Sequence, residues 1–103
     1  MLPQSDLEEA PVAEAEEKVG EPPLFKVLLH NDDYTTMDFV VYVLESIFNM
    51  PENQAIQVML NVHVKGIGVA GVYTYEIAEM KVAKTTAAAR EHEFPLLCTM
   101  ERL

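Results

Sequence analysis

The sequence places an apolar strand directly before a cluster of polar residues, and an apolar-faced helix directly after it. Residues 28–37 read Leu-Leu-His-Asn-Asp-Asp-Tyr-Thr-Thr-Met, so Asn31, Asp32 and Asp33 fill the turn between the two elements. Their amide and carboxylate oxygens stand at the mouth of any hollow that Leu29 and the helix line. Acceptors at the rim of an apolar pocket suit a ligand that is cationic at one end and hydrophobic at the other. The pattern predicts a strand–turn–helix unit with a binding site at its turn.

Composition limits the kind of protein that contains this unit. With 103 residues, half of them hydrophobic, the chain is expected to form one small domain. A net charge of −10 argues against binding to nucleic acids, which requires clustered Lys and Arg, and against binding to anionic membranes. The single cysteine, Cys98, excludes an intrachain disulfide and offers no ligand cluster for structural zinc. No signal-peptide pattern is visible, so we expect a cytoplasmic protein.

The acidic charge is concentrated at the beginning of the chain. Residues 1–23 contain seven of the 17 acidic residues, one of the seven basic residues and four of the six prolines. A segment with so few large apolar side chains buries too little surface to offset its loss of conformational entropy. We therefore predict a disordered acidic arm over 1–23 and a folded domain over 24–103. From composition alone, a solubilising tail and a functional arm are equally supported.

Hydrophobic periodicity predicts three strands and three helices in the folded domain. The strands are expected at 24–29, 68–73 and 95–100, and the helices at 35–48, 51–65 and 74–90. Thr35 is expected to cap the first helix with Asp38 three residues later, and Gly66 to end the second helix. The order β-α-α-β-α-β predicts an α+β sandwich in which three helices cover one face of a three-stranded antiparallel sheet.

A histidine on the second helix is the best companion for the polar turn. His63 follows Met59 by four residues, so one helix face presents an imidazole beside apolar groups. If Asn31 lies near His63, the two side chains can jointly hold a polar group above the apolar surface. Each feature also has a plainer interpretation, because histidine suits the end of a helix, and Asn and Asp suit strand-to-helix turns. Taken singly, the plainer interpretations are favoured.

Enzymatic and metal-binding functions find less support. Asp32 or Asp33 can pair with His63, yet no serine or cysteine nucleophile stands beside them. Cys98 lies within a predicted strand, where a buried thiol is inert. The glycines at 66 and 68 do not form a phosphate-binding loop. We therefore assign no catalytic residue, no metal site and no cofactor.

Several ordered motifs together resemble the bacterial ClpS adaptor family. These motifs are residues 31–35, 37–40, 58–63, 78–83 and 95–101. The resemblance covers about residues 24–103, with the elements in order. ClpS adaptors bind the first residue of substrates that carry an N-terminal degron, and they deliver these substrates to the ClpA unfoldase of the ClpAP protease. The resemblance implies this function, with Leu, Phe, Tyr and Trp as the accepted first residues.

The resemblance also implies roles for individual residues. The substrate α-amino group would be held by Asn31, Asp32 and His63. The pocket for the first side chain would be lined by Thr35, Met37, Val40, Met59, Val62 and Leu96. Docking on the ClpA N-terminal domain would use Tyr34, Glu76 and Lys81, and the acidic arm matches the flexible extension of such adaptors in character only. Thr36 stands where the family usually has proline, which we expect to loosen the helix start slightly.

Two other functions remain open from the sequence. One is a different protein-interaction module, similar in build to the C-terminal domain of the ribosomal stalk protein, which does not need acceptors around an apolar pocket. The other is a small hydrolase that uses Asp32 and His63. Binding of peptides through a free amino terminus favours the adaptor over the first alternative, and peptide turnover without an added protease favours the hydrolase.

Overall fold

A three-stranded antiparallel sheet carries the helices of this chain. The structure, a computed structural model, describes residues 20–103, so the predicted acidic arm lies outside it except for residues 20–23. The elements are β2 (Leu24–His30), α1 (Met37–Ser46), α2 (Glu52–Lys65), β3 (Ile67–Thr74), α3 (Tyr75–Glu91) and β4 (Leu97–Arg102). The strand order is β3-β2-β4, with both pairs antiparallel. The predicted α+β fold is confirmed.

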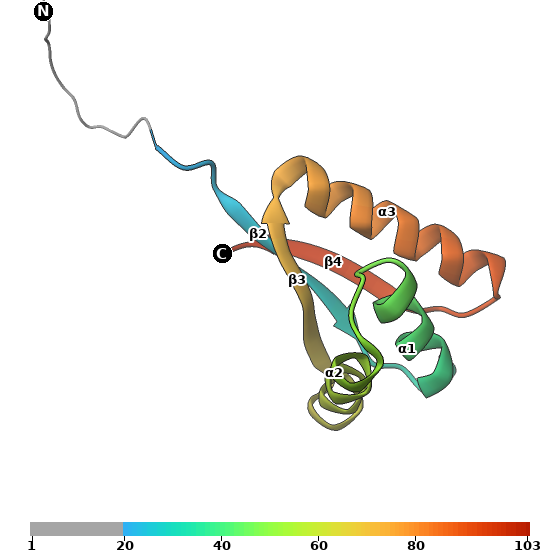
Figure 1. Ribbon diagram of the computed structural model, residues 1–103. Helices are drawn as coiled ribbons and strands as arrows, with labels where there is room; N and C mark the ends of the chain where they lie inside the picture. Colours follow the sequence, from blue (N-terminus) through green and yellow to red (C-terminus); the bar gives the residue numbers. More distant parts are fainter. Residues whose placement is uncertain (1–19) are drawn as a thin grey trace, which may run out of the picture.

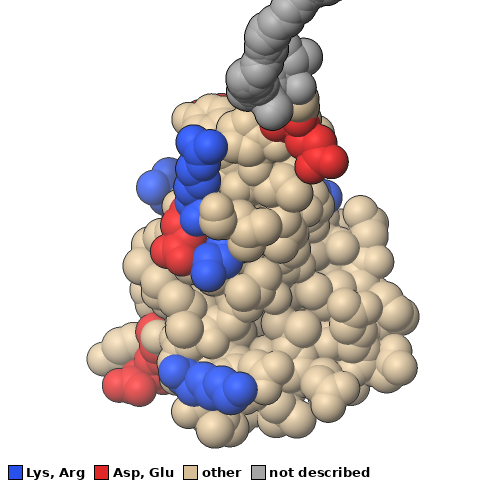
Figure 2. All heavy atoms as spheres, turned by 90° about the vertical axis from the view of Figure 1, so that its left-hand side faces the viewer, with Lys and Arg blue, Asp and Glu red and all other residues tan. Residues whose placement is uncertain are grey.

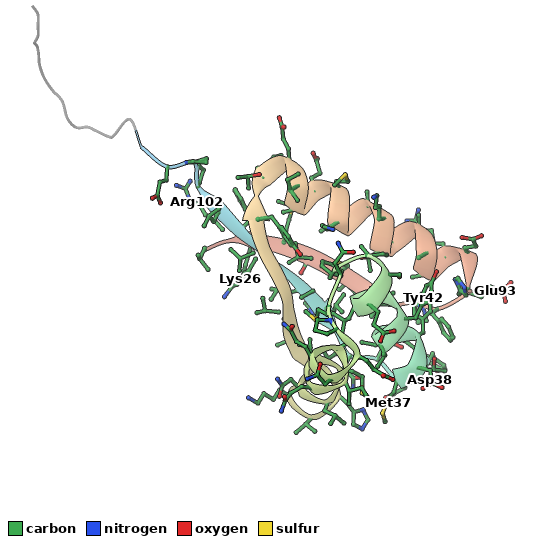
Figure 3. All side chains as sticks on the ribbon, in the orientation of Figure 1. Lys26, Met37, Asp38, Tyr42, Glu93 and Arg102 are labelled. Carbon is green, nitrogen blue, oxygen red and sulfur yellow. The ribbon has the colours of Figure 1, made fainter. Side chains whose placement is uncertain are left out.

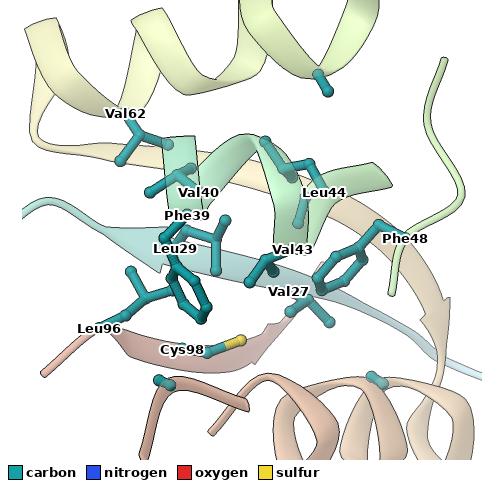
Figure 4. Packing of buried hydrophobic residues seen from close by; sticks show 14 residues of the cluster. Val27, Leu29, Phe39, Val40, Val43, Leu44, Phe48, Val62, Leu96 and Cys98 are labelled. Atoms are coloured by element: carbon teal, nitrogen blue, oxygen red, sulfur yellow. The ribbon is translucent and has the colours of Figure 1, made fainter. Parts of the chain in front are cut away.

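The helices are gathered on one side of the sheet. Helix α3 packs against all three strands, and α1 lies beside it, while α2 lies at the end where β3 begins (Figure 1). The central strand β2 supplies Val27 and Leu29, which are fully buried. Val43 and Leu44 of α1 pack into the same core (Figure 4). This packing fixes α1 against the sheet, so the turn between β2 and α1 is held at both ends.

The opposite side of the sheet carries few charged groups. Lys26 and Glu101 form an ion pair there at 3.2 Å, from neighbouring strands. His30 and Thr99 are hydrogen-bonded on the same face, with 2.8 Å between His30 Nε2 and Thr99 Oγ1. Figure 2 shows that Lys, Arg, Asp and Glu side chains lie mainly along one margin of this side, next to a broad uncharged area. Since the helices lie on the other side, they cover one face of the sheet only.

The cap of α1 differs from the predicted one. Thr36, not Thr35, is the N-cap residue, and its hydroxyl oxygen accepts a hydrogen bond of 3.1 Å from the Phe39 N–H. Such a cap stabilises a helix by about 1 kcal/mol. Thr35 instead belongs to the turn before the helix.

The expected starts of the second helix at residue 51 and of the last strand at residue 95 are slightly too early. Pro51 is the N-cap residue of α2 and precedes its first helical residue, and Pro95 precedes β4, which begins at Leu97. Gly66 ends α2 as predicted, in a left-handed conformation with φ of 89°. A residue with a side chain is strained in that conformation, so the glycine is what allows α2 to stop there and the chain to turn into β3.

Candidate functional site

A cavity of about 300 Å³ opens where the end of β2, the start of α1 and the second half of α2 meet. Its lining residues are Asn31, Asp32, Asp33, Thr35, Thr36, Met37, Val40, Met59, Val62 and His63. The polar ones come from the turn and from the end of α2, and the apolar ones from the facing sides of the two helices. The structure thus brings together the polar turn, the histidine and the apolar stripe that the sequence singled out.

Asp32 shapes the turn that forms the polar end of the cavity. Its Oδ1 accepts hydrogen bonds from the backbone N–H groups of Tyr34 and Thr35, at 2.8 and 2.7 Å, and its Oδ2 accepts one from the Thr35 hydroxyl at 2.7 Å. Burial raises the pKa of Asp32, but these hydrogen bonds lower it by more, so it lies below its ordinary value. Asp32 is therefore an ionised carboxylate at neutral pH, with both oxygens already engaged by the turn.

Asn31 and His63 are brought to the cavity by a backbone contact between β2 and α2. The N–H of Asn31 donates a 2.8 Å hydrogen bond to the carbonyl of Gly66, the residue that ends α2. His63 lies in the last turn of the same helix. Both side chains are exposed at the cavity rim. An amide oxygen and an imidazole nitrogen are acceptors for a cationic donor, so this end of the cavity suits an ammonium group.

The apolar walls are formed by α1 and α2. Val40 and Val62 are buried and lie next to each other between the two helices (Figure 4). Met59 is half-buried, and Met37 is exposed at the entrance, beside α2 in Figure 3. At Gly68 on β3, an added Cβ would meet Val62 Cγ2 at 2.6 Å. The glycine therefore lets α2 approach the strand closely enough to hold Val62 in the cavity wall.

Two predicted pocket residues take part differently. Thr35 lines the cavity, but its hydroxyl is used in the hydrogen bond to Asp32. Leu96 is buried in the core near Leu29 and Phe39 and does not belong to the lining of the cavity (Figure 4). A contribution of Leu96 to ligand binding therefore stays a prediction.

The three predicted docking residues lie outside the cavity. Tyr34 and Glu76 are exposed, at the turn and in the first turn of α3. Lys81 is half-buried, and its ammonium group donates a 2.5 Å hydrogen bond to the carbonyl of Ile47 in the turn between α1 and α2. The same ammonium lies 5.8 Å from the ring centre of Phe48 and 5.7 Å from that of Tyr73. Lys81 thus has an internal contact that the sequence did not indicate.

Sequence reasoning missed one residue of the cavity. Thr36 lines the cavity, and its only signal in the sequence is its position beside the predicted cap.

Between residues 20 and 103, no group of three His, Cys, Asp or Glu side chains is placed to hold a metal ion. None of the helices in that range has the length and apolar character needed to cross a membrane.

Comparisons with known proteins agree with one another. The family model described as ATP-dependent Clp protease adaptor protein ClpS matches residues 20–99. The ClpS protein of Caulobacter vibrioides strain NA1000 is 55% identical over 91 residues, which cover 88% of this chain and 84% of the relative. The ClpS protein of Oleidesulfovibrio alaskensis is 60% identical over 88 residues, or 85% of each chain. The structure of Agrobacterium tumefaciens ClpS2 bound to L-phenylalaninamide has a TM-score of 0.78 and 41% identity, and the match covers 81% of this chain and 100% of that one.

Proposed function

Since the chain belongs to the ClpS family and is an N-degron-binding adaptor of a Clp protease, we propose that its cavity receives the first residue of the substrate. The observation that carries this proposal is the pairing of two exposed acceptors, Asn31 and His63, with an apolar cavity between α1 and α2. The ligand of the Agrobacterium tumefaciens relative, L-phenylalaninamide, has the matching chemistry, with a free α-amino group beside an apolar side chain.

The amino group of the substrate binds at the polar end. An α-amino group has a pKa of roughly 7.7–8.0, so it is largely protonated at neutral pH and offers three donors. The Asn31 amide oxygen and a ring nitrogen of His63 accept two of them, and Asp32 contributes its negative charge and any acceptor capacity left by the turn. Each charge-assisted hydrogen bond is worth roughly 1.5–3 kcal/mol net. Two such bonds therefore distinguish a free amino terminus from an internal residue.

The first side chain enters the apolar end. Val40, Met59 and Val62 offer the apolar surface, and burying a side chain such as Leu or Phe there stabilises the complex by roughly 1.5–3 kcal/mol. Met37 at the entrance narrows the cavity beside the Cβ of the ligand. Leu, Phe, Tyr and Trp branch no earlier than Cγ, whereas Ile and Val are branched at Cβ. We therefore expect Leu and the aromatic residues as first residues.

The partner unfoldase is proposed to be ClpA, which binds through its N-terminal domain. Exposed Tyr34 and Glu76 suit a protein contact, and Lys81 follows Glu76 by five residues on α3. Removing residues 1–20 is expected to leave peptide affinity unchanged and to abolish ClpA-dependent degradation of a degron-tagged substrate. Normal degradation with the shortened chain contradicts a delivery role for the arm. The cytoplasmic location expected from the sequence stays a prediction.

A binding role without catalysis is supported by the hydrogen bonds of Asp32. Its carboxylate accepts from Thr35 and Tyr34 instead of orienting the His63 ring, which is what a hydrolytic pair requires. The relatives are named as adaptors, which agrees with this proposal. The alternative of a protein-interaction module built like the C-terminal domain of the ribosomal stalk protein is set aside, because the chain belongs to the ClpS family.

The decisive experiment is a titration of the protein with labelled peptides that differ only in their first residue. We expect tight binding of peptides that begin with Leu or Phe, and severe loss of binding when the amino group is acetylated. Acetylation removes the charge and two of the donors. Equal affinity for the free and the acetylated peptide contradicts recognition of the amino terminus. Release of cleaved peptide without an added protease contradicts the binding-only role.

A further inference from the structure

Helix α2 carries apolar side chains on its outer side as well as on its inner side. Ala55, Val58, Met59 and Val62 face the core and the cavity. Ile56, Leu60 and Val64 follow one another at intervals of four residues and are 40%, 47% and 77% exposed. Residues four apart lie on one helix face, so these three form a continuous apolar stripe, which we call the outer stripe.

The outer stripe also lacks charge. Residues 53–64 contain no Asp, Glu, Lys or Arg, although such residues make up 23% of the whole chain. Single exposed apolar residues are normal on protein surfaces and need no explanation. A charge-free stretch that combines three exposed aliphatic residues on one face of a surface helix is different, because an exposed helix usually presents charged residues to water.

The outer stripe borders the rim of the cavity. Each helical residue is turned by about 100° from the one before it. Ile56 therefore lies only about 20° around the helix from His63, and Leu60 about 60° from it. His63 and Met59 belong to the cavity, so the apolar surface continues from the cavity over the rim and onto the outside of α2.

We propose that the outer stripe is a second subsite, which binds residues two to four of the N-degron and favours apolar side chains there. This inference rests on the proposed function, because the peptide must leave the cavity at its rim. L-phenylalaninamide, the ligand of the Agrobacterium tumefaciens relative, ends in an amide where the second residue would begin, so it stops short of such a subsite. From Ile56 to Val64 the helix rises by about 12 Å, the length of three or four extended residues.

The test compares two peptides and one small ligand on the native chain and two variants. Both peptides begin with Leu; residues two to four are apolar in one and Ser or Gln in the other. L-phenylalaninamide reports on the cavity alone. The variant Ile56→Gln/Leu60→Gln removes the apolar surface with a residue that favours helices. The matched control is Ile77→Gln/Met80→Gln on α3, whose side chains are each 41% exposed and lie away from the cavity.

We expect the native chain to bind the apolar peptide about fivefold or more tightly than the polar one, since partial burial of two aliphatic groups has that effect. Ile56→Gln/Leu60→Gln should lose this preference and still bind L-phenylalaninamide as the native chain does, and the α3 control should keep the preference. A native chain without the preference, or a variant that retains it, overturns the inference.

Two further outcomes also decide the matter. If the native chain binds neither L-phenylalaninamide nor the peptides, the proposed function fails, and the subsite fails with it. If the native chain is a dimer in sedimentation and Ile56→Gln/Leu60→Gln is a monomer, the outer stripe is an interface between two copies of the chain, which overturns its assignment to the substrate.

Discussion

The two ends of the cavity are built by different means. The polar end is built around one short turn, in which Asp32 fixes Tyr34 and Thr35 through hydrogen bonds within four residues of sequence, and His63 joins it from the end of α2. The apolar end is formed by two helices, and its width depends on contacts with β3 and α3 that lie far away in the sequence. The difference teaches that the shape of the turn beside the amino group is set locally in the chain, whereas the position of His63 and the width of the apolar end depend on how α2 packs in the domain.

Changes at the polar end should have the largest effect on affinity. Asn31→Ala or His63→Ala removes one acceptor for the ammonium group, and we expect a loss of roughly 1.5–3 kcal/mol in binding of a Leu-first peptide. Fluorescence anisotropy of a labelled peptide measures this loss. The hydrogen bond from Asn31 to Gly66 is made by the Asn31 backbone, so Asn31→Ala should keep the fold, which circular dichroism checks. An affinity within twofold of the native value in both variants contradicts the assignment of these acceptors.

A change at the apolar end should alter selectivity more than affinity. Met37→Ala widens the entrance, and an over-packed site rejects extra bulk at a cost of typically 1–3 kcal/mol. We expect the native chain to bind Leu-first peptides much more tightly than Ile-first or Val-first peptides, and the variant to reduce this difference. Competition titrations with the three peptides measure it. A native chain that binds all three equally shows that Met37 does not select.

The distant support of the apolar end can be removed at Lys81. Lys81→Met breaks the hydrogen bond to Ile47 and the contacts with the rings of Phe48 and Tyr73. We expect the free energy of unfolding to fall by about 1–2 kcal/mol and peptide binding to weaken several-fold, with a smaller preference for Leu over Ile. Lys84→Met, at an exposed lysine of the same helix, is the matched control. If both variants have the same peptide affinity and the same selectivity, Lys81 does not influence binding in the cavity.

The smallest expected effect concerns the stability of the polar turn. Because the pKa of Asp32 is lowered in the folded chain, its carboxylate stabilises the fold at neutral pH, and this contribution disappears as the pH falls through the lowered pKa. Asp32→Asn lacks the titrating group. Urea unfolding at neutral pH and at low acidic pH should therefore show a greater loss of stability in the native chain than in the variant. Equal losses contradict a stabilising role for the Asp32 carboxylate.

The same contrast explains what the sequence could and could not predict. The turn at Asn31 and Asp32, the end of α2 at Gly66 and the apolar faces of α1 and α2 are coded by residues close together in the chain, and they were predicted. The choice between Thr35 and Thr36 as the cap was wrong, because two adjacent threonines carry the same local signal and only the hydrogen bonds to Asp32 and Phe39 distinguish them. Local boundaries of this kind depend on which neighbour engages each hydroxyl.

Contacts between distant segments could not be predicted. The hydrogen bond from Lys81 to the Ile47 carbonyl joins residues 34 positions apart. Every residue has a backbone carbonyl, so the sequence does not indicate which one accepts from Lys81. The burial of Leu96 depends on how β4 meets the sheet and α1, since an isolated strand pattern does not tell which face is covered. The residues of the polar turn, His63 and the apolar faces were singled out from the sequence, and the resemblance to the family supplied their roles, which the substitutions above test.

The position of Lys81 has a consequence for how the two binding events are related. It lies on the surface proposed for the unfoldase, yet it holds the turn that joins the two helices of the cavity. If a partner that draws the ammonium group away from Ile47 changes the affinity for the degron, the degron changes the affinity for that partner by the same factor, by thermodynamic reciprocity. One lysine would then couple capture of the substrate to its transfer.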